Sequence, residues 1–340
     1  MAAAAKTVKS VESGMLRDGC GRVHDYLRIA VTDRCNLRCL YCMPSGVKCA
    51  APAETLLTDD EIVRISRLFA RLGVVKIRLT GGEPLLRPGI SGLAARLAAV
   101  SGIHTVAVTT NGLRLAEKVR ALRDAGVRGI NVSLDSLRPE RFRRIAGHDG
   151  LARVLDGIAA ALDCGIQPLK INMVVMGGLN DDELLDFVEL TRNSPACVRF
   201  IEFMPFPGNP WCDAQVVPHA AMRKAIESRH PLETVSGTVR GRVAKEFRVP
   251  GFRGSLGFIT PMTDHFCGGC SRLRLTADGS LKTCLFHAPE FSLRDAMRGG
   301  ADDGDLADMV QSALKGKPRA HAEGAVLVAG GGRSMFQIGG

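Results

Sequence analysis

The stretch YLRIAVTDRCNLRCLYC, residues 26–42, decides the fold. Its first half is rich in branched and aromatic side chains, which predicts a strand over residues 26–32. Three cysteines with the spacing CxxxCxxC follow at once, at Cys35, Cys39 and Cys42. Three thiolates in one loop can hold three irons of a [4Fe–4S] cluster and leave the fourth iron open to a small molecule. A zinc ion is the alternative occupant of this loop. Zinc needs four protein ligands, however, and no second cysteine pair nearby supplies the missing one.

The pattern of the first strand repeats along the chain, alternating with amphipathic helical stretches. Further strands are predicted over 75–80, 104–110, 129–134, 169–175 and 198–204, and helices over 58–72, 89–100, 113–125, 151–164 and 181–192. Helix starts carry capping signals, such as Thr58 with Glu61 three residues later. We predict an α/β protein in which six βα units form a partial (β/α)6 TIM-like barrel.

Proline and glycine become frequent after Met204, and hairpin-like runs follow near residues 245–249 and 256–260. This change predicts a barrel over residues 26–210 and a C-terminal α+β extension over residues 211–340. Residues 1–25 are expected to form a partly mobile N-terminal segment.

The amino-acid composition argues against a membrane protein, a fully disulfide-linked protein and a nucleic-acid-binding protein. The chain of 340 residues has no unbroken apolar stretch of membrane-spanning length, so a cytoplasmic protein without a membrane partner is expected. Its 11 cysteines are an odd number, which excludes complete pairing in disulfides and favours metal binding. The net charge of +10 comes with only 5% aromatic residues and no run of five basic residues, so no nucleic-acid partner is predicted.

A second cysteine group lies in the extension, at Cys267, Cys270 and Cys284. Three cysteines again permit a [4Fe–4S] cluster with one open iron, which here would hold a substrate atom. A structural zinc with His265 or His287 as fourth ligand is the alternative, and the spacing leaves both open.

Positive charges occur on the predicted inner face of several strands. Lys76 and Arg78 alternate with apolar neighbours, so both point to the same side of their strand. Similar positions are taken by Lys170, by Arg199, and by Arg272 with Arg274 after the second cysteine pair. Buried cations need an anion to neutralise them, so this pattern predicts a cavity that binds phosphates.

These motifs resemble the radical S-adenosylmethionine (SAM) superfamily, which carries CxxxCxxC with an aromatic residue before the last cysteine and a GGEP-like turn, here Gly81-Gly82-Glu83-Pro84. The resemblance implies that Cys35, Cys39 and Cys42 hold the first cluster, and that SAM binds its open iron. It also implies four contacts with SAM, at Tyr41, Gly82, Ser133 and Met204.

Within that superfamily the chain resembles the GTP 3′,8-cyclase family of molybdenum cofactor biosynthesis, through residues 27–35, 77–84 and 198–204, the second cysteine triad and the closing Gly339-Gly340. The resemblance implies that GTP lies between two clusters and is cyclised through a deoxyadenosyl radical. It implies catalytic roles for Arg272, Arg274, Gly339 and Gly340. The implied GTP contacts are Arg28, Lys76, Arg78, Thr109, Lys170, Arg199, Arg272, Leu273 and Arg274.

The same resemblance implies an electron donor, a downstream cyclic pyranopterin monophosphate synthase and a homodimer. Two alternatives remain at this point. One is a radical SAM enzyme that modifies a peptide, which usually has more cysteines in its extension. The other is a zinc-stabilised nucleic-acid-binding protein, which leaves the inward charges unexplained.

Overall fold

A computed structural model describes residues 14–43, 51–235, 243–286, 290–322, 326–327 and 332–339. Among these residues the strands form one sheet in the order β12-β11-β10-β1-β2-β3-β4-β5-β6-β9-β8-β7. The strands are β1 (Tyr26–Ala30), β2 (Lys76–Thr80), β3 (Thr105–Thr110), β4 (Val127–Ser133), β5 (Leu169–Val175), β6 (Cys197–Glu202), β7 (Glu233–Thr234), β8 (Lys245–Arg248), β9 (Ser255–Ile259), β10 (Arg272–Leu275), β11 (Ser280–Lys282) and β12 (Phe291–Ser292).

All six strands predicted for the barrel are present, and they pair in parallel in sequence order. The extension adds to both edges of this sheet. Strand β10 pairs in parallel with β1, and β9 pairs in parallel with β6, so eight neighbouring strands run the same way. The predicted hairpin runs are the antiparallel β8 and β9. The predicted α/β architecture of six parallel βα units is therefore confirmed, whereas the division at residue 211 stays a prediction.

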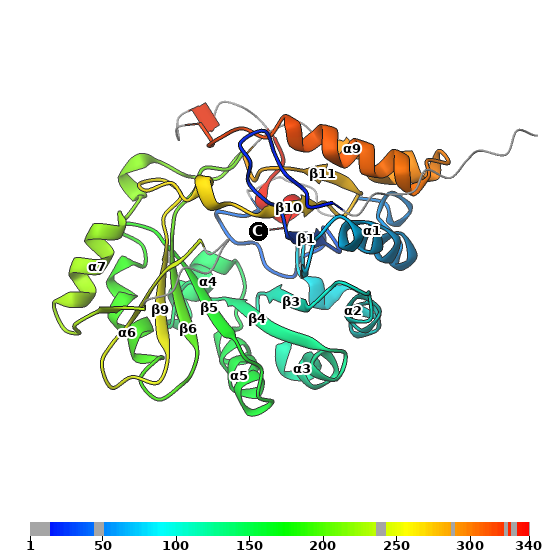
Figure 1. Cartoon of the computed structure of the whole chain (residues 1–340). Coiled ribbons are helices and arrows are strands. Elements are labelled where there is room, and N and C mark those ends of the chain that lie inside the picture. The colour runs from blue at the N-terminus through cyan, green and yellow to red at the C-terminus, as the bar shows by residue number, and fades with distance from the viewer. Residues whose placement is uncertain are drawn as a thin grey trace, which may run out of the picture.

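The helices are α1 (Asp59–Arg71), α2 (Ile90–Ala98), α3 (Leu115–Asp124), α4 (Pro139–Ala146), α5 (Leu151–Asp163), α6 (Leu184–Glu189), α7 (His219–Glu227), α8 (Leu293–Arg298), α9 (Asp303–Lys315) and α11 (Met335–Ile338). Figure 1 shows the sheet as a curved wall, with α2, α3 and α5 on its outer side and α9 beside β10 and β11. Among the described residues, no helix has the length and apolar content needed to cross a bilayer.

Local signals explain where these helices start and stop. Thr58 and Glu61 form the predicted capping box at the start of α1. Helix α4 was not predicted, although Pro139 at its first turn and Gly147 at its end are ordinary boundary signals. The helix predicted over 181–192 is shorter, because a 3-10 turn takes its first residues and α6 ends at Glu189.

The hydrophobic core lies between the outer face of the sheet and the helices. Leu27 and Ile29 of β1 and Ile77 of β2 are fully buried, and so are Leu68 and Phe69 of α1. Burying side chains of this size stabilises the fold by about 1.5–3 kcal/mol each. Since the outward residues of these strands supply the core, the alternate residues are left to line the inside of the curved sheet.

Candidate active site

A cavity of about 500 Å³ lies on the inner side of the sheet. Most of the site residues predicted from sequence line it. These are Arg28, Tyr41, Lys76, Arg78, Thr109, Ser133, Lys170, Arg199, Met204, Cys267, Cys270, Arg272, Arg274 and Cys284. These predicted residues come from seven of the eight parallel strands, from Tyr41 and Met204 in the loops and from the second cysteine triad, and Ile259 of β9 also lines the cavity.

Among the described residues, the predicted site residues that do not line this cavity are Gly82, Leu273, Gly339 and the first cysteine triad, Cys35, Cys39 and Cys42. Leu273 is fully buried in the hydrophobic core, so that only its backbone is available to a ligand. Gly339 is held beside Arg274, and Gly340 lies outside the described residues.

The first cysteine loop leaves β1 and folds back on itself, with the amide of Cys42 donating to the carbonyl of Cys39 over 2.9 Å. Burial raises the pKa of Cys35 to about 11. Burial also raises the pKa of Cys39 well above its usual range, and neighbouring Cys42, Asp135 and Cys35 add to the effect. Partly buried thiols that raise the pKa of a neighbour in this way are unfavourable as thiolates unless a metal cation compensates them, since a coordinating thiol loses its proton. The loop therefore fits an iron–sulfur cluster.

The glycines of the GGEP turn permit a close approach between two backbone segments. A Cβ atom on Gly81 would lie 2.2 Å from the carbonyl oxygen of Thr32, and one on Gly82 would lie 2.2 Å from that of Arg34. The amide of Gly82 donates to Thr32 over 2.8 Å. The turn thus fixes the segment that leads into the cysteine loop, a constraint that no larger residue permits.

Glu83 of the same turn points into the protein. Its side chain accepts hydrogen bonds from the amides of Leu85 and Asn111 and from the hydroxyl of Thr110, over 2.7–2.9 Å. Burial raises its pKa to about 7 despite these bonds. Glu83 therefore ties the turn to the end of β3.

Tyr41 reaches from the cysteine loop to β4 and β5. Its hydroxyl donates to Oδ2 of Asp135 over 2.7 Å, and Oδ1 of Asp135 accepts from the amide of Val174 over 2.8 Å. Tyr41, Asp135 and the nearby Ser133 line the cavity. Asp135 was missed at the sequence level, where nothing separates it from an ordinary polar residue after a strand.

The second cysteine triad forms another part of the wall, with Cys267, Cys270 and Cys284 all lining the cavity. Burial by itself raises the pKa of Cys270, but Arg272 and Lys317 outweigh it and lower the pKa to about 7. Among the described residues, no three His, Cys, Asp or Glu side chains converge as the ligands of a single metal ion do. His287, one candidate for a zinc ligand, lies outside those residues. Three thiols that share one cavity wall fit a cluster that gives each thiolate its own iron.

Positive charge dominates the cavity. Its described lining includes seven Lys and Arg side chains against the carboxylates of Asp25, Asp135 and Glu246. Burial, and next to it the charge of Arg199, lower the pKa of Lys170 to about 8. Burial likewise lowers the pKa of Arg274 far below its usual range, aided by Arg28 and Arg272. So many buried cations require an anionic ligand.

Two buried polar atoms in the cavity wall have no partner among the described residues, namely Nε of Arg199 and Oδ1 of Asn172. Buried polar groups nearly always form hydrogen bonds, so an unpaired donor and acceptor on neighbouring strands point to a bound ligand. Arg199 has one weak contact, 4.0 Å to Glu246.

Tyr26 is a further cavity residue that the sequence did not single out. Its hydroxyl accepts a hydrogen bond of 2.6 Å from Nε of Arg78, and the ammonium of Lys76 lies 4.9 Å from the centre of its ring. The register explains this, because Tyr26 is directly opposite Lys76 on β2 and Arg272 on β10. Arg78 also donates to the carbonyl of Val108 over 2.8 Å, which fixes its guanidinium.

The C-terminal segment is docked against the cavity. Met335 lines it, Phe336 and Ile338 are buried, and Nη1 of Arg274 donates to the carbonyl of Gly339 over 2.8 Å. Gly339 has a φ of +71°, and an added Cβ would lie 2.6 Å from Cγ2 of Thr80.

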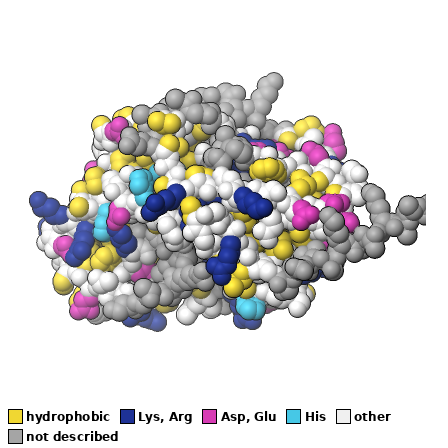
Figure 2. Space-filling model, turned by 45° about the horizontal axis from the view of Figure 1, so that its top comes forward, with side chains coloured by type: hydrophobic (Ala, Val, Ile, Leu, Met, Phe, Trp, Pro, Cys, Tyr) yellow, Lys and Arg dark blue, Asp and Glu magenta, His cyan; other side chains and the backbone are white. Residues whose placement is uncertain are grey.

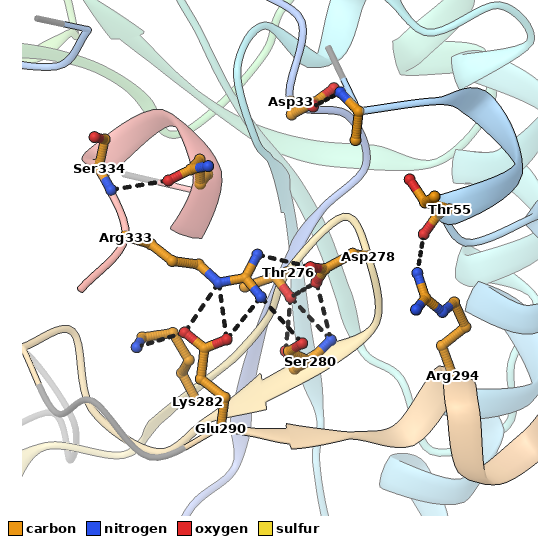
Figure 3. A network of polar contacts seen from close by, with 12 residues as sticks. Asp33, Thr55, Thr276, Asp278, Ser280, Lys282, Glu290, Arg294, Arg333 and Ser334 are labelled. Atoms are coloured by element: carbon orange, nitrogen blue, oxygen red, sulfur yellow. Dashed lines mark hydrogen bonds and ion pairs between the residues drawn. The ribbon is translucent and has the colours of Figure 1, made fainter. Parts of the chain in front are cut away.

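Ion pairs hold the start of this segment. Figure 3 shows Arg333 between Asp278 and Glu290, each 2.7 Å away. Arg333 also donates to the hydroxyl of Ser280 over 3.2 Å. The hairpin formed by β10 and β11 thus anchors the C-terminal segment next to the cavity.

The outer surface is different. Among the described residues visible in Figure 2, Lys and Arg side chains lie in separate groups among hydrophobic and other atoms.

Comparison with known proteins defines the class first. Residues 29–191 match the model of the Radical SAM superfamily, and residues 196–323 match that of Molybdenum Cofactor Synthesis C. Among solved structures, SuiB of Streptococcus suis bound to S-adenosylmethionine has a TM-score of 0.55 and 16% identity, covering 84% of this chain and 68% of that chain. The fold and the cysteine loop are those of a radical SAM enzyme, a class that uses a [4Fe–4S] cluster and SAM.

Curated relatives narrow the class. A mitochondrial GTP 3′,8-cyclase of Arabidopsis thaliana is 47% identical over 96% of this chain and 84% of the relative. A GTP 3′,8-cyclase of Listeria monocytogenes is 43% identical over 90% of this chain and 92% of the relative. The human molybdenum cofactor biosynthesis protein 1 is 48% identical, and the chain spans 49% of its length. The chain belongs to the GTP 3′,8-cyclase family of molybdenum cofactor biosynthesis.

Proposed function

We propose that this chain converts GTP, with SAM and a reductant, to 3′,8-cyclo-7,8-dihydroguanosine 5′-triphosphate, 5′-deoxyadenosine and methionine. This is the first step of molybdenum cofactor biosynthesis. One observation carries the proposal: a single buried cavity joins a surplus of cations to a cysteine triad, in a chain 43–48% identical to curated members of that family. The cations suit a triphosphate, and the triad suits a centre that holds the base.

The phosphates are bound by side chains of neighbouring strands. Arg28, Lys76 and Arg78 come from β1 and β2, and Lys170 and Arg199 come from β5 and β6. Thr109 lies next to Arg78, whose Nη1 is 3.3 Å from its hydroxyl. The unpaired Nε of Arg199 and Oδ1 of Asn172 gain partners when the ligand binds. Rigid strands hold these donors in place, so little order is lost on binding.

The other part of the cavity binds SAM. Cys35, Cys39 and Cys42 hold the first cluster, and Tyr41, Gly82, Ser133 and Met204 contact SAM. When bound, the cluster and SAM supply a deoxyadenosyl radical. The hydrogen bond from Tyr41 to Asp135 braces the cysteine loop against β4, which keeps the distance between SAM and the substrate fixed.

We assign a second [4Fe–4S] cluster to Cys267, Cys270 and Cys284, which would hold it and leave one iron without a protein ligand, available to the guanine. Arg272 and Arg274 point from β10 into the same space, while Leu273 contributes its backbone. We also assign catalytic roles to Gly339 and Gly340, and the guanidinium of Arg274 donates a hydrogen bond to the carbonyl of Gly339.

The proposed reaction implies two protein partners. The reaction needs an electron donor, and its product needs a downstream cyclic pyranopterin monophosphate synthase. We further propose a homodimer and a cytoplasmic location, although the Arabidopsis thaliana relative is named mitochondrial. Sedimentation and cell fractionation test these two points.

Anaerobic reconstitution followed by incubation with SAM, dithionite and GTP tests the activity. We expect loss of GTP together with 5′-deoxyadenosine and a cyclised nucleotide, and about eight irons per chain for two clusters. The double variant Arg272→Ala, Arg274→Ala should lose GTP turnover by about 10²–10⁴-fold, at about 1.5–3 kcal/mol per charged hydrogen bond.

Arg123→Ala, at an exposed site on α3, is the matched control and should keep full turnover. SAM cleavage that does not respond to GTP would contradict the proposal. Turnover near the wild-type level in the double variant would contradict the assignment of the two arginines.

A further inference from the structure

The segment before β1, which carries no recognisable motif, packs behind the second cysteine triad. Residues 17 and 23 form an antiparallel bridge, so the segment is a short hairpin. Arg22 lies at its end and donates to the carbonyls of Cys267, Pro318 and Arg319 over 2.6–2.9 Å. The N-terminal hairpin, the triad and the segment after α9 are therefore one unit.

Lys317, in the segment after α9, is a buried cation. It is 5% exposed, and its ammonium lies 3.1 Å from the carbonyl oxygen of Arg272, 3.5 Å from Nδ1 of His24 and 3.9 Å from Sγ of Cys270. An ammonium has three N–H donors, and these are three acceptors. No carboxylate of the described residues pairs directly with Lys317, so the sulfur of Cys270 is the group that carries the compensating charge.

His24 is held so that it accepts from Lys317. The ring is fully buried, and its Nε2 lies 2.9 Å from Oδ2 of Asp18. Because Nε2 carries the proton that Asp18 accepts, Nδ1 presents its lone pair to the ammonium. Asp18 is fixed in turn by Arg22, over 2.6 Å, and by the amides of Cys20 and Arg22. Asp18, His24 and Lys317 thus form a relay that ends at a cysteine.

We propose that this relay, formed by Asp18, His24 and Lys317, aims a positive charge at the sulfur of Cys270 and so sets the reduction potential of the second cluster. The inference rests on the proposed second cluster. A reduced cluster carries one more negative charge, so a nearby ammonium stabilises it and makes its potential less negative. Hydrogen bonds to cluster sulfurs act in the same direction.

The test is a redox titration followed by electron paramagnetic resonance in the full chain. Replacing Cys35, Cys39 and Cys42 by alanine leaves only the second cluster, so its signal stands alone. Lys317→Met and Lys317→Gln both remove the charge, and Lys317→Gln still donates to the carbonyl of Arg272. Lys317→Arg retains the charge, and Lys315→Met makes the same change at an exposed position two residues earlier.

We expect a more negative potential in Lys317→Met and Lys317→Gln, and a potential near that of the parent in Lys317→Arg and Lys315→Met. Loss of cluster iron from the two neutral variants alone would also support the role of the charge. Unchanged potentials in both neutral variants with full iron would overturn the inference, as would loss of iron in Lys317→Arg as well. A parent protein without any iron at this triad would refute the second cluster itself, and the inference with it.

Discussion

Tyr26 should ionise near neutral pH in the ligand-free protein. Three cations surround its hydroxyl: Arg78, which donates to it over 2.6 Å, then Arg28 and Lys76. Burial alone raises the pKa of Tyr26, but these cations outweigh it and lower the pKa from 10.0 to about 7. The chain has 2 tyrosines, and burial together with Asp135 raises the pKa of the other one, Tyr41, well above its usual range. One of the two tyrosines, Tyr26, should therefore ionise at a pH about three units lower than an ordinary tyrosine does.

The assay is the ultraviolet absorbance of tyrosinate between about pH 5 and pH 9 in protein without ligands. The wild type and Tyr41→Phe should both show one transition near pH 7, and Tyr26→Phe should show none. The pKa of Tyr26 is lower in the folded protein than in the unfolded chain, so ionisation of Tyr26 stabilises the folded state. This stabilisation is complete above the unfolded pKa of 10.0 and is lost as the pH falls to the folded pKa of about 7. A triphosphate should raise the midpoint, because it neutralises the same cations. A wild type without a transition below about pH 9, or a transition that persists in Tyr26→Phe, would refute this electrostatic account of the cavity.

The remaining predictions concern the tail and the packing of glycines. Gly339→Ala places a Cβ 2.6 Å from Thr80 at a φ of +71°, so the free energy of docking the tail should weaken by about 2–5 kcal/mol. We expect GTP turnover to collapse while the melting temperature of the protein stays within a few degrees. Arg333→Ala removes both ion pairs of the tail anchor, and we expect faster proteolysis of the tail and lower turnover, with unchanged iron content. In Gly112→Ala the added Cβ lies 2.9 Å from Val154, and the free energy of unfolding measured in urea should fall by about 2–5 kcal/mol. In Gly165→Ala the φ is +71° but no atom lies within 4 Å of the added Cβ, so the free energy of unfolding should fall by only about 1–2 kcal/mol. Equal stability losses in these last two variants would show that backbone strain, and not the clash, decides the outcome.

Alternation of side chains along the strands was enough to predict the six βα units and most of the cavity wall. Lys76 and Arg78 share a face by the two-residue period of a strand, and both line the cavity. The same period places Ile77 in the core. The sequence could not show that β9 and β10 join opposite edges of the same sheet, because pairing between strands this far apart depends on tertiary contacts.

The residues that sequence reasoning missed act through partners distant in the chain. Tyr26 is an ordinary strand residue until β2 and β10 place Lys76 and Arg272 opposite it. Asp135 gains meaning from its bond to Tyr41, which lies 94 positions away. His24 and Lys317 are 293 positions apart and meet behind the second triad. No local pattern signals such pairs, although a buried polar residue always requires a partner once the fold is known.

The charge distribution links stability to function in this molecule. Burial lowers the pKa of Arg28 to about 10 and of Lys170 to about 8, so the ligand-free fold carries an electrostatic cost that its core must offset. An anion that binds only the folded state reduces that cost, and by linkage it raises the free energy of unfolding. The ionisable Tyr26 partly fulfils this role before a ligand arrives, since a phenolate beside Arg78 supplies one negative charge to the same cluster. Substrate phosphates and the phenolate therefore compete for the same cations. Binding of a triphosphate should be accompanied by uptake of a proton at about pH 8, which lies above the pKa of Tyr26 in the ligand-free protein.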